Sequence, residues 1–356
     1  MNLISLGWND FFEAAFQPFT NKDFYAGRVF LEHKQYLQVY CEFDEIVCEI
    51  SGKYRHEAKL QDAFPAVGDW IVFRYIENER KGIVQAVLPR KSKISRKAAG
   101  LNTVEQVIAA NVDYLFIVTS LNTDFNLRRL ERYLTVAWDS GSSPVIILNK
   151  ADLCDNVADY IAETEEVAMG VPIHLLSAIN DQGIEQLQTY FSGHKTCALV
   201  GSSGVGKSTI INSIIGEERQ RVNVLRSAVD KGRHTTTQRE MVLLPESGLL
   251  IDTPGMREIQ LWDADLGVAE AFEEITEFAQ NCRFRDCQHL QEPGCAVRQA
   301  VENGDIKKER YANFQKMQEE LQQLKQKQEL HSRLEKKRQD KILHRAIKNM
   351  KKIRGR

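Results

Sequence analysis

The chain has 356 residues, of which 43% are hydrophobic and 27% are charged. This is the composition of a globular protein that is too long for one ordinary core, so we expect two or three domains. No apolar run approaches the roughly 18 residues of a transmembrane helix. The first 20 residues are amphipathic and acidic, unlike a secretory signal, and the seven cysteines are an odd number. Both features favour a cytoplasmic protein with reduced thiols and no membrane association.

The net charge of −2 conceals a strong asymmetry along the chain. From Lys307 to Arg356 there are 17 Lys and Arg residues against 6 Asp and Glu residues, so the preceding part is acidic. An acidic body with a basic tail indicates a polyanionic partner at one end of the protein.

Short strands with alternating polarity follow one another between residues 26 and 96. They cover 27–30, 37–40, 46–50, 69–73 and 82–87. Five such strands within so short a stretch predict a small β-barrel, for which the OB-fold is the natural candidate. Within it we expect Trp70 and Phe73 to be structural residues, and the basic segment 89–97 to lead out of the barrel.

The next region alternates between apolar strands and helical or loop segments. The strands are expected at 114–118, 145–148, 173–176, 198–200, 241–244 and 249–251. Nearly continuous apolar strands of this kind predict a parallel sheet covered on both faces. Beyond Trp262 the chain reads as helical, with a Cys-rich interruption and a final long helix.

The first of the motifs in this region is Asn149-Lys150-Ala151-Asp152, at the end of a predicted strand. The Asp152 carboxylate can accept hydrogen bonds from N1–H and the exocyclic amine of guanine, a donor pair that adenine lacks. A buried carboxylate left without these donors would disfavour ATP. We expect Asn149 to read the other base edge, Lys150 to lie along the ring, and the loop at Ser177 and Ala178 to meet the guanine O6.

A complete phosphate-binding loop, Gly-x4-Gly-Lys-Ser, follows between an apolar strand and a helix. Glycines allow backbone N–H groups to approach phosphates, and the helix N-terminus favours negative charge. Lys207 is expected to place its cation on the β- and γ-phosphates, and Ser208 to supply a hydroxyl to Mg²⁺. The expected nucleotide contacts are Gly201, Ser202, Ser203, Gly204, Val205, Gly206, Lys207, Ser208 and Thr209.

Two further segments complete the predicted nucleotide site. Asp252 ends a buried strand and is expected to hold Mg²⁺ through water, while the Gly255 N–H contacts the γ-phosphate. The polar segment 231–237 lies where the first switch belongs. One of its three threonines should complete the Mg²⁺ shell, and Thr236 is our candidate among Thr235, Thr236 and Thr237. His234 either activates the attacking water or is an exposed loop histidine, because Met256 cannot position water.

A Cys/His cluster follows, with the pattern Cys282-x4-Cys287-x-His289-x5-Cys295. Three thiols and one imidazole within so short a segment predict a closed, structural zinc site, and the alternative is a group of free thiols. Arg283 and Arg285, between the ligands, either face RNA phosphates or are solvated.

The last segment is predicted as a long helix. Phe314, Met317, Leu321 and Leu324 recur at helical spacing and should pack one face on the body. From Arg333 onward the charge is mostly positive, which favours RNA phosphates as partner, a solvated tail being the alternative. In this basic part the apolar face formed by Leu343, Ile347 and Met350 is narrow and lacks Trp, which disfavours a membrane surface.

The reversed order of the motifs, with the base-reading segment before the phosphate loop, carries a family resemblance. Together with the barrel before and the Cys/His cluster after, it resembles the circularly permuted, ribosome-small-subunit-dependent GTPases of the RsgA/YjeQ family. Segments 109–113 and 232–237 are similar to that family's signatures. The resemblance implies zinc at the cluster, a water-activating role for His234, and late maturation of the small (30S) ribosomal subunit through its rRNA.

We therefore expect a multidomain α/β protein with an N-terminal segment and OB-fold barrel at 1–98. A circularly permuted P-loop GTPase domain should follow at 99–262, and a helical zinc-binding domain with a basic C-terminal helix at 263–356. The predicted activity is Mg²⁺-dependent hydrolysis of GTP to GDP and phosphate by a monomer. One alternative is a GTP-dependent RNA-binding assembly chaperone with negligible hydrolysis. The other is an ATP-using P-loop kinase or ATPase, which Asn149 and Asp152 disfavour.

Overall fold

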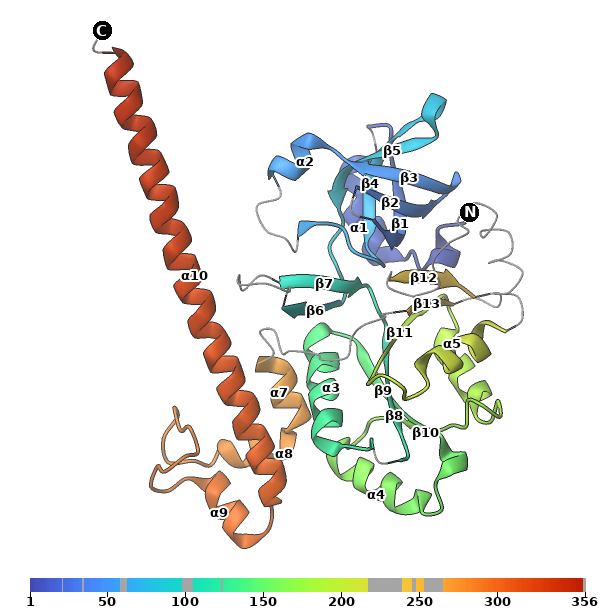
Figure 1. Cartoon of the computed structure of the whole chain (residues 1–356), viewed down its shortest axis with the longest axis vertical. Helices are drawn as coiled ribbons and strands as arrows, with labels where there is room; N and C mark the ends of the chain where they lie inside the picture. Colours follow the sequence, from blue (N-terminus) through green and yellow to red (C-terminus); the bar gives the residue numbers. More distant parts are fainter. Residues whose placement is uncertain are drawn as a thin grey trace.

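The structure, a computed structural model, describes residues 1–20, 22–33, 35–57, 63–97, 105–122, 124–216, 239–244, 248–252 and 265–354. Within these residues no helix is long and apolar enough to cross a membrane. Figure 1 shows three parts: a barrel, a central sheet flanked by helices, and a helical C-terminal part that ends in one long helix.

The N-terminal part is a closed barrel of five strands, as the sequence predicted. The strands are β1 (Phe24–Glu32), β2 (Tyr36–Cys41), β3 (Asp44–Ile50), β4 (Trp70–Ile76) and β5 (Lys81–Val87), with helix α2 (Gly52–Glu57) between β3 and β4. The order β1-β2-β3-β5-β4 closes because β4 also pairs with β1. Only the β3–β5 pair of this barrel is parallel. This five-stranded closure is that of an OB-fold, and the fully buried Trp70 and Phe73 are structural residues as expected.

The N-terminal segment covers one end of the barrel. It consists of two short 3-10 helices, η1 (Ile4–Leu6) and η2 (Gln17–Phe19), around helix α1 (Asp10–Phe16). Asn9 caps α1 by accepting a hydrogen bond from the Phe11 N–H. The rings of Trp8 and Phe12 contact Trp70 at centroid distances of 4.7 and 5.7 Å. The amphipathic start of the chain is therefore part of the core.

The barrel leads into a two-stranded sheet that the sequence did not predict. Strands β6 (Lys93–Lys97) and β7 (Glu105–Ala110) pair in antiparallel fashion. The sequence of β6 shows no alternation of hydrophobic and polar residues, because four of its five residues are polar or charged. We therefore interpreted the segment as a basic linker.

The central sheet is formed by the middle part of the chain. Its strands are β8 (Tyr114–Ser120), β9 (Ser143–Asn149), β10 (Ile173–Leu175), β11 (Thr196–Val200), β12 (Glu240–Leu243) and β13 (Leu249–Asp252). The order is β10-β9-β8-β11-β13-β12, and all neighbours are parallel except β12 and β13. The expectation of a parallel sheet is wrong for β12. The connection from Leu243 to Leu249 is far too short for a parallel crossover, which needs about a dozen residues or more.

Helices cover both faces of this sheet, as predicted. One face packs against α3 (Leu127–Ser140) and α4 (Val157–Val167), and the other against α5 (Lys207–Ile215) and the 3-10 helix η6 (Ile184–Phe191). The sheet also continues into the barrel, because β12 pairs with β1 at Glu240 and Leu31.

The C-terminal part is helical, as the sequence predicted. It contains α7 (Asp265–Ala271), α8 (Glu273–Ala279), α9 (Ala296–Asn303) and the 47-residue α10 (Lys308–Arg354). Phe314, Met317 and Leu321 of α10 are buried, as their spacing predicted, whereas Leu324 is half-buried. The rest of α10 runs from α8 and α9 toward the other end of the molecule (Figure 1).

A buried arginine joins the barrel to the rest of the protein. Arg28 of β1 is 2% exposed. Its guanidinium donates to the Leu6 carbonyl (2.5 Å), the Gly68 carbonyl (3.2 Å), the Asn111 carbonyl (3.1 Å) and the Thr196 hydroxyl (2.8 Å). Burial lowers the pKa of Arg28 to about 10, so the group is still charged at neutral pH. All of these acceptors are neutral, and they come from the N-terminal segment, the barrel and the central sheet.

We expect Arg28→Met to destabilise the protein by roughly 3 kcal/mol or more, because several buried acceptors lose a charged donor at once. The measurement is the free energy of unfolding from urea denaturation. Arg74→Met is the matched control, since Arg74 lies exposed on β4 of the same barrel. Equal losses in the two variants would show that Arg28 contributes no more than a surface arginine.

Candidate functional site

The predicted motifs meet because their strands are parallel neighbours. Strands β8 and β9 are in register from Tyr114 opposite Ser143 to Ser120 opposite Asn149. Strand β11 lies between β8 and β13, with Ala198 opposite both Leu115 and Ile251. The carboxyl ends of these strands therefore share one edge of the sheet, the edge at which ligands bind in open α/β sheets.

The phosphate loop joins β11 to α5 and depends on glycine at two positions. Gly201 has φ 145°, and a Cβ there would lie 2.2 Å from the Val118 carbonyl oxygen. Gly206 has φ 102°, and its Cβ would lie 2.1 Å from Asn149 Nδ2. Lys207 Nζ donates to the carbonyls of Gly201 (2.7 Å) and Ser202 (2.6 Å), which folds the lysine back over its own loop. Between these points Ser203 and Gly204 are exposed, as are Ser208 and Thr209 at the start of α5.

Asn149 connects the three loops of the predicted nucleotide site. The side chain is 2% exposed. Its Nδ2 donates to the Val205 carbonyl in the phosphate loop (2.8 Å), and its Oδ1 accepts from the Ala178 N–H (3.1 Å). We expected Asn149 to read a base edge and the Ala178 loop to offer its N–H to guanine. In the structure these two groups bond to each other, so Asn149 positions loops.

Asp152 and Ser177 form the polar end of the base-reading segment. The Ser177 hydroxyl donates to Asp152 Oδ1 (2.5 Å) and accepts from Asn180 Nδ2 (3.0 Å). Asp152 is exposed, whereas the sequence argument treated its carboxylate as buried. The burial that the argument requires would therefore come from the bound base itself. The preceding Lys150 has φ 63°, a left-handed conformation that turns the chain from β9 into the 3-10 helix η5 (Ala151–Leu153).

The predicted magnesium ligands come from neighbouring strands. Asp252 is the last residue of β13, beside β11, whose loop leads to Ser208. A carboxylate and a hydroxyl are oxygen ligands of the kind that Mg²⁺ prefers, so these residues fit the ion. The predicted residues Thr236, His234 and Gly255 lie outside the described part of the chain.

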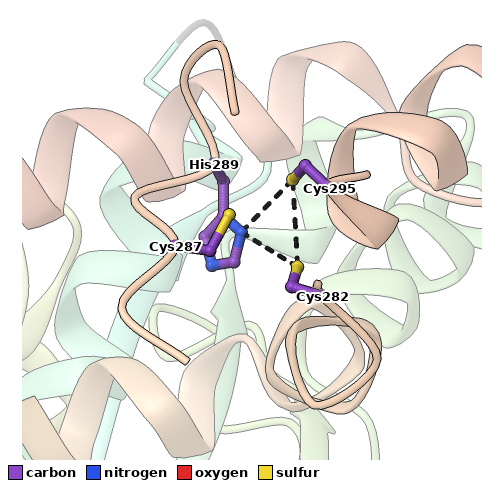
Figure 2. Close-up of side chains that lie close together, drawn as sticks. All are labelled: Cys282, Cys287, His289 and Cys295. Atoms are coloured by element: carbon purple, nitrogen blue, oxygen red, sulfur yellow. Dashed lines mark hydrogen bonds between the residues drawn. The ribbon is translucent and has the colours of Figure 1, made fainter. Parts of the chain in front are cut away.

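The Cys/His cluster is assembled between α8 and α9 (Figure 2). One donor atom from each of Cys282, Cys287, His289 and Cys295 lies within 4.8 Å of the others. Cys282 Sγ is 3.6 Å from His289 Nδ1 and 3.9 Å from Cys295 Sγ, and Cys295 Sγ is 3.5 Å from the same nitrogen. Zinc bonds of about 2.3 Å to sulfur and about 2.0 Å to nitrogen place tetrahedral ligand atoms about 3.5–3.8 Å apart. The geometry is therefore compatible with zinc.

The thiol chemistry of the cluster also favours a cation. Burial, together with hydrogen bonds to the thiols of Cys295 and Cys282, raises the pKa of Cys287 to about 11. Three clustered thiolates repel one another unless a positive charge lies among them. Cys295 also caps α9, since its sulfur accepts from the Arg298 N–H (3.4 Å), where a helix N-terminus stabilises negative charge.

Comparison with known proteins gives the family. A family model described as RsgA GTPase matches residues 87–262. Small ribosomal subunit biogenesis GTPase RsgA of Opitutus terrae is 46% identical over 329 residues, covering 90% of each chain. The protein of the same name from Syntrophotalea carbinolica is 38% identical over 365 residues, covering 100% of this chain and 99% of the relative. This chain belongs to the RsgA GTPase family.

Solved structures agree with this assignment to the RsgA family. YjeQ from Thermotoga maritima aligns with a TM-score of 0.62 and 30% identity, over 84% of this chain and 98% of that chain. YloQ, described as a circularly permuted GTPase, aligns with a TM-score of 0.60 and 25% identity, over 86% and 97%. A second family model, described as 50S ribosome-binding GTPase, matches residues 196–340.

As a member of the RsgA family, the chain is a GTP hydrolase that uses GTP and Mg²⁺. The permutation is visible in the sheet, because β9 with the base-reading segment precedes β11 with the phosphate loop. The predicted fold class is confirmed: a barrel, a permuted GTPase domain, and a helical part with a Cys/His cluster compatible with zinc. The alternative of an ATP-using kinase is thereby excluded.

Helix α3 carries three functional contacts that the sequence analysis missed. Burial raises the pKa of the Tyr133 hydroxyl, which lies near the side chain of Ser202 in the phosphate loop. Two positions earlier, Glu131 pairs with Arg310 of α10 at 2.5 Å and accepts a hydrogen bond from Asn313. Arg132 forms a bidentate pair with Glu320 at 2.8 and 2.9 Å. No motif marks these residues, because each is one member of a contact between distant segments.

The Glu131 pair is the buried part of this connection. Glu131 is 2% exposed, and burial raises its pKa while the Arg310 charge opposes that shift. Arg310 also pairs with Glu274 of α8, and its guanidinium carbon lies 4.8 Å from the centre of the Phe272 ring. One arginine thus fastens α8 and α10 to the GTPase domain.

We expect Asn149→Ala to weaken GTP and GDP binding by about 10- to 100-fold, because a buried carbonyl and a buried N–H lose their partner and the loops separate. Titration with fluorescent nucleotides measures this. Asn156→Ala is the control, since Asn156 is an exposed asparagine bonded to Asp159 of α4. Wild-type affinity in the Asn149 variant would contradict a loop-positioning role.

Proposed function

We propose that this GTPase acts in late maturation of the small (30S) ribosomal subunit by binding its rRNA. The observation that carries the proposal is the 46% identity, over 90% of each chain, to a relative named small ribosomal subunit biogenesis GTPase. The second family model is named for the large subunit, but it covers only residues 196–340. The full-length relatives therefore support the small subunit as the partner. The role places the protein in the cytoplasm, and we propose that it acts as a monomer.

The proposed site residues follow the geometry. Asp152 selects guanine, with Lys150 along the ring and Ser177 and Ala178 completing the base loop. Asn149 holds this loop and the phosphate loop in position. Residues 201–209 hold the phosphates, with Lys207 as the catalytic cation. Ser208 and Asp252 would hold Mg²⁺, which neutralises phosphate charge when bound. Outside the described residues, we propose that His234 orients the water, Thr236 completes the metal shell and Gly255 contacts the γ-phosphate.

The proposed domains are 1–98, 99–262 and 263–356.

The packing of α7 on α3 suggests how the nucleotide could act on the last domain. Gly255 lies in the segment that precedes α7 in the sequence, and α7 packs closely on α3. A Cβ at Gly267 of α7 would lie 2.0 Å from the Thr135 carbonyl oxygen. We propose that loss of the γ-phosphate contact at Gly255 shifts α7 on α3. The Glu131–Arg310 pair would then be the pivot about which the C-terminal domain turns.

The test of the function is multiple-turnover GTP hydrolysis with and without purified small subunits, with large subunits as the matched control. We expect small subunits to raise the rate by at least about tenfold, which corresponds to about 1.4 kcal/mol of transition-state stabilisation. No stimulation, or equal stimulation by both subunits, would contradict the proposal. The alternative of a chaperone with negligible hydrolysis is not favoured, because the family is one of GTPases.

We further propose that the Cys/His cluster holds one structural Zn²⁺. Purified protein should then contain one equivalent of zinc per chain, and Cys287→Ser should lower zinc affinity by at least about 100-fold, because one of four ligands is lost. Competition with a chromogenic chelator measures this. Cys154→Ser is the control, since Cys154 is a half-buried thiol outside the cluster. Equal zinc retention in the two variants would refute the assignment.

A further inference from the structure

The loop between the first two ligands of the Cys/His cluster displays an unusual set of side chains. Arg283, Phe284 and Arg285 are all exposed, and Phe284 has 40% of its surface accessible. Both ends of this short loop are tied to the cluster, through Cys282 and Cys287. An exposed aromatic ring between two arginines contributes little to the core and leaves a ring face open to a partner.

The arginine before the ring is held in place. The Arg283 N–H donates to the Gly294 carbonyl at 3.1 Å, and the stem of Arg283 packs on Gly294, where a Cβ would lie 3.1 Å from Arg283 Cβ. Gly294 has φ 75°, a left-handed conformation that favours glycine, and the contact with Arg283 would be tight for any larger residue. The Arg283 guanidinium carbon lies 5.5 Å from the centre of the Phe284 ring. Cation and ring are thus arranged before any partner binds.

The charge around the ring is available for a ligand. Within the described part of the chain, neither Arg283 nor Arg285 forms an ion pair. The loop itself carries one carboxylate, Asp286, which is exposed. The carboxylate between the last two cysteines of the cluster is occupied. Glu292 accepts hydrogen bonds from the N–H groups of Gln288 (3.0 Å), Leu290 (2.9 Å) and Gln291 (3.0 Å). These hydrogen bonds lower the pKa of the Glu292 carboxyl group. They also hold the backbone of residues 288–291 in place.

We infer that Phe284 is a stacking platform for an unpaired RNA base, with Arg283 and Arg285 binding the phosphates beside it. A phenyl ring offers no hydrogen bond, so its specific use is its face, and base faces are accessible only in single-stranded RNA. Arginine forks match phosphate oxygens and also stack on rings. The Tyr311 hydroxyl near the start of α10 donates to the carbonyl of His289, which ties the Cys/His cluster to this helix. The inference rests on the proposed rRNA-binding function and names the surface that reads unpaired bases.

The test compares full-length variants by fluorescence anisotropy with a labelled single-stranded RNA and with a hairpin duplex of equal length. We expect Phe284→Leu to weaken single-strand binding by about 5- to 100-fold and to leave duplex binding unchanged, because stacking is lost while charge is kept. Titrations at several salt concentrations separate this effect from phosphate contacts, which weaken with salt. Leu290→Ala is the control, since Leu290 is an exposed hydrophobic residue between Cys287 and Cys295, outside the 282–287 loop. Unchanged zinc content verifies the fold of each variant.

Three results would overturn the inference. Single-strand affinity in the Phe284 variant could equal that of the wild type, or duplex affinity could fall as far as single-strand affinity. Alternatively, the variant could lose affinity for small subunits while binding their naked rRNA normally, which would identify a protein partner. Failure of the ribosomal function is distinguishable, because wild-type GTP hydrolysis would then not respond to small subunits at all.

Discussion

The architecture depends on one buried cation. Arg28 donates to the Leu6 carbonyl, the Asn111 carbonyl and the Thr196 hydroxyl, groups that belong to the N-terminal segment, the β7–β8 turn and the first residue of β11. Because β11 ends in the phosphate loop, the barrel is fixed to the strand that carries the nucleotide site. Removing a charged group from water is costly unless hydrogen bonds in the interior replace its hydration. The acceptors around Arg28 provide this replacement, so they must keep their positions.

The C-terminal domain is attached by a different kind of contact. Glu131 of α3 and Arg310 of α10 form a buried ion pair, two positions along α3 from Tyr133. The barrel therefore joins the GTPase domain through the neutral acceptors of Arg28 and through the pairing of β1 with β12. The helical domain joins it through ion pairs with α3 and α4 and through the packing of α7 on α3. Such a pivot would permit rotation of the helical domain while the barrel stays in place, which makes the C-terminal domain the part that the nucleotide can move.

The nucleotide site was predictable where local spacing encodes chemistry. The phosphate loop, the segment 149–152 and the Cys/His cluster each hold their functional groups within a few residues, and the structure brings the described members together. The role of Asn149 was not predictable in the same way. Its partners Val205 and Ala178 are 56 and 29 residues distant in sequence, and only the parallel order of β8, β9 and β11 makes them neighbours. The antiparallel turn of β12 was missed because apolar runs do not reveal strand direction.

The sequence by itself determined the GTPase motifs, the barrel, the permutation and the Cys/His cluster, because each follows from residue types at fixed short spacing. Tertiary structure alone decided how the parts are joined. Arg28 lies 22 residues from one hydrogen-bond partner and 168 from another, and Glu131 lies 179 residues from Arg310. No periodicity or motif encodes such pairs. They exist because the sheet order and the packing of α3 bring distant segments into contact, where a buried charge must find a partner.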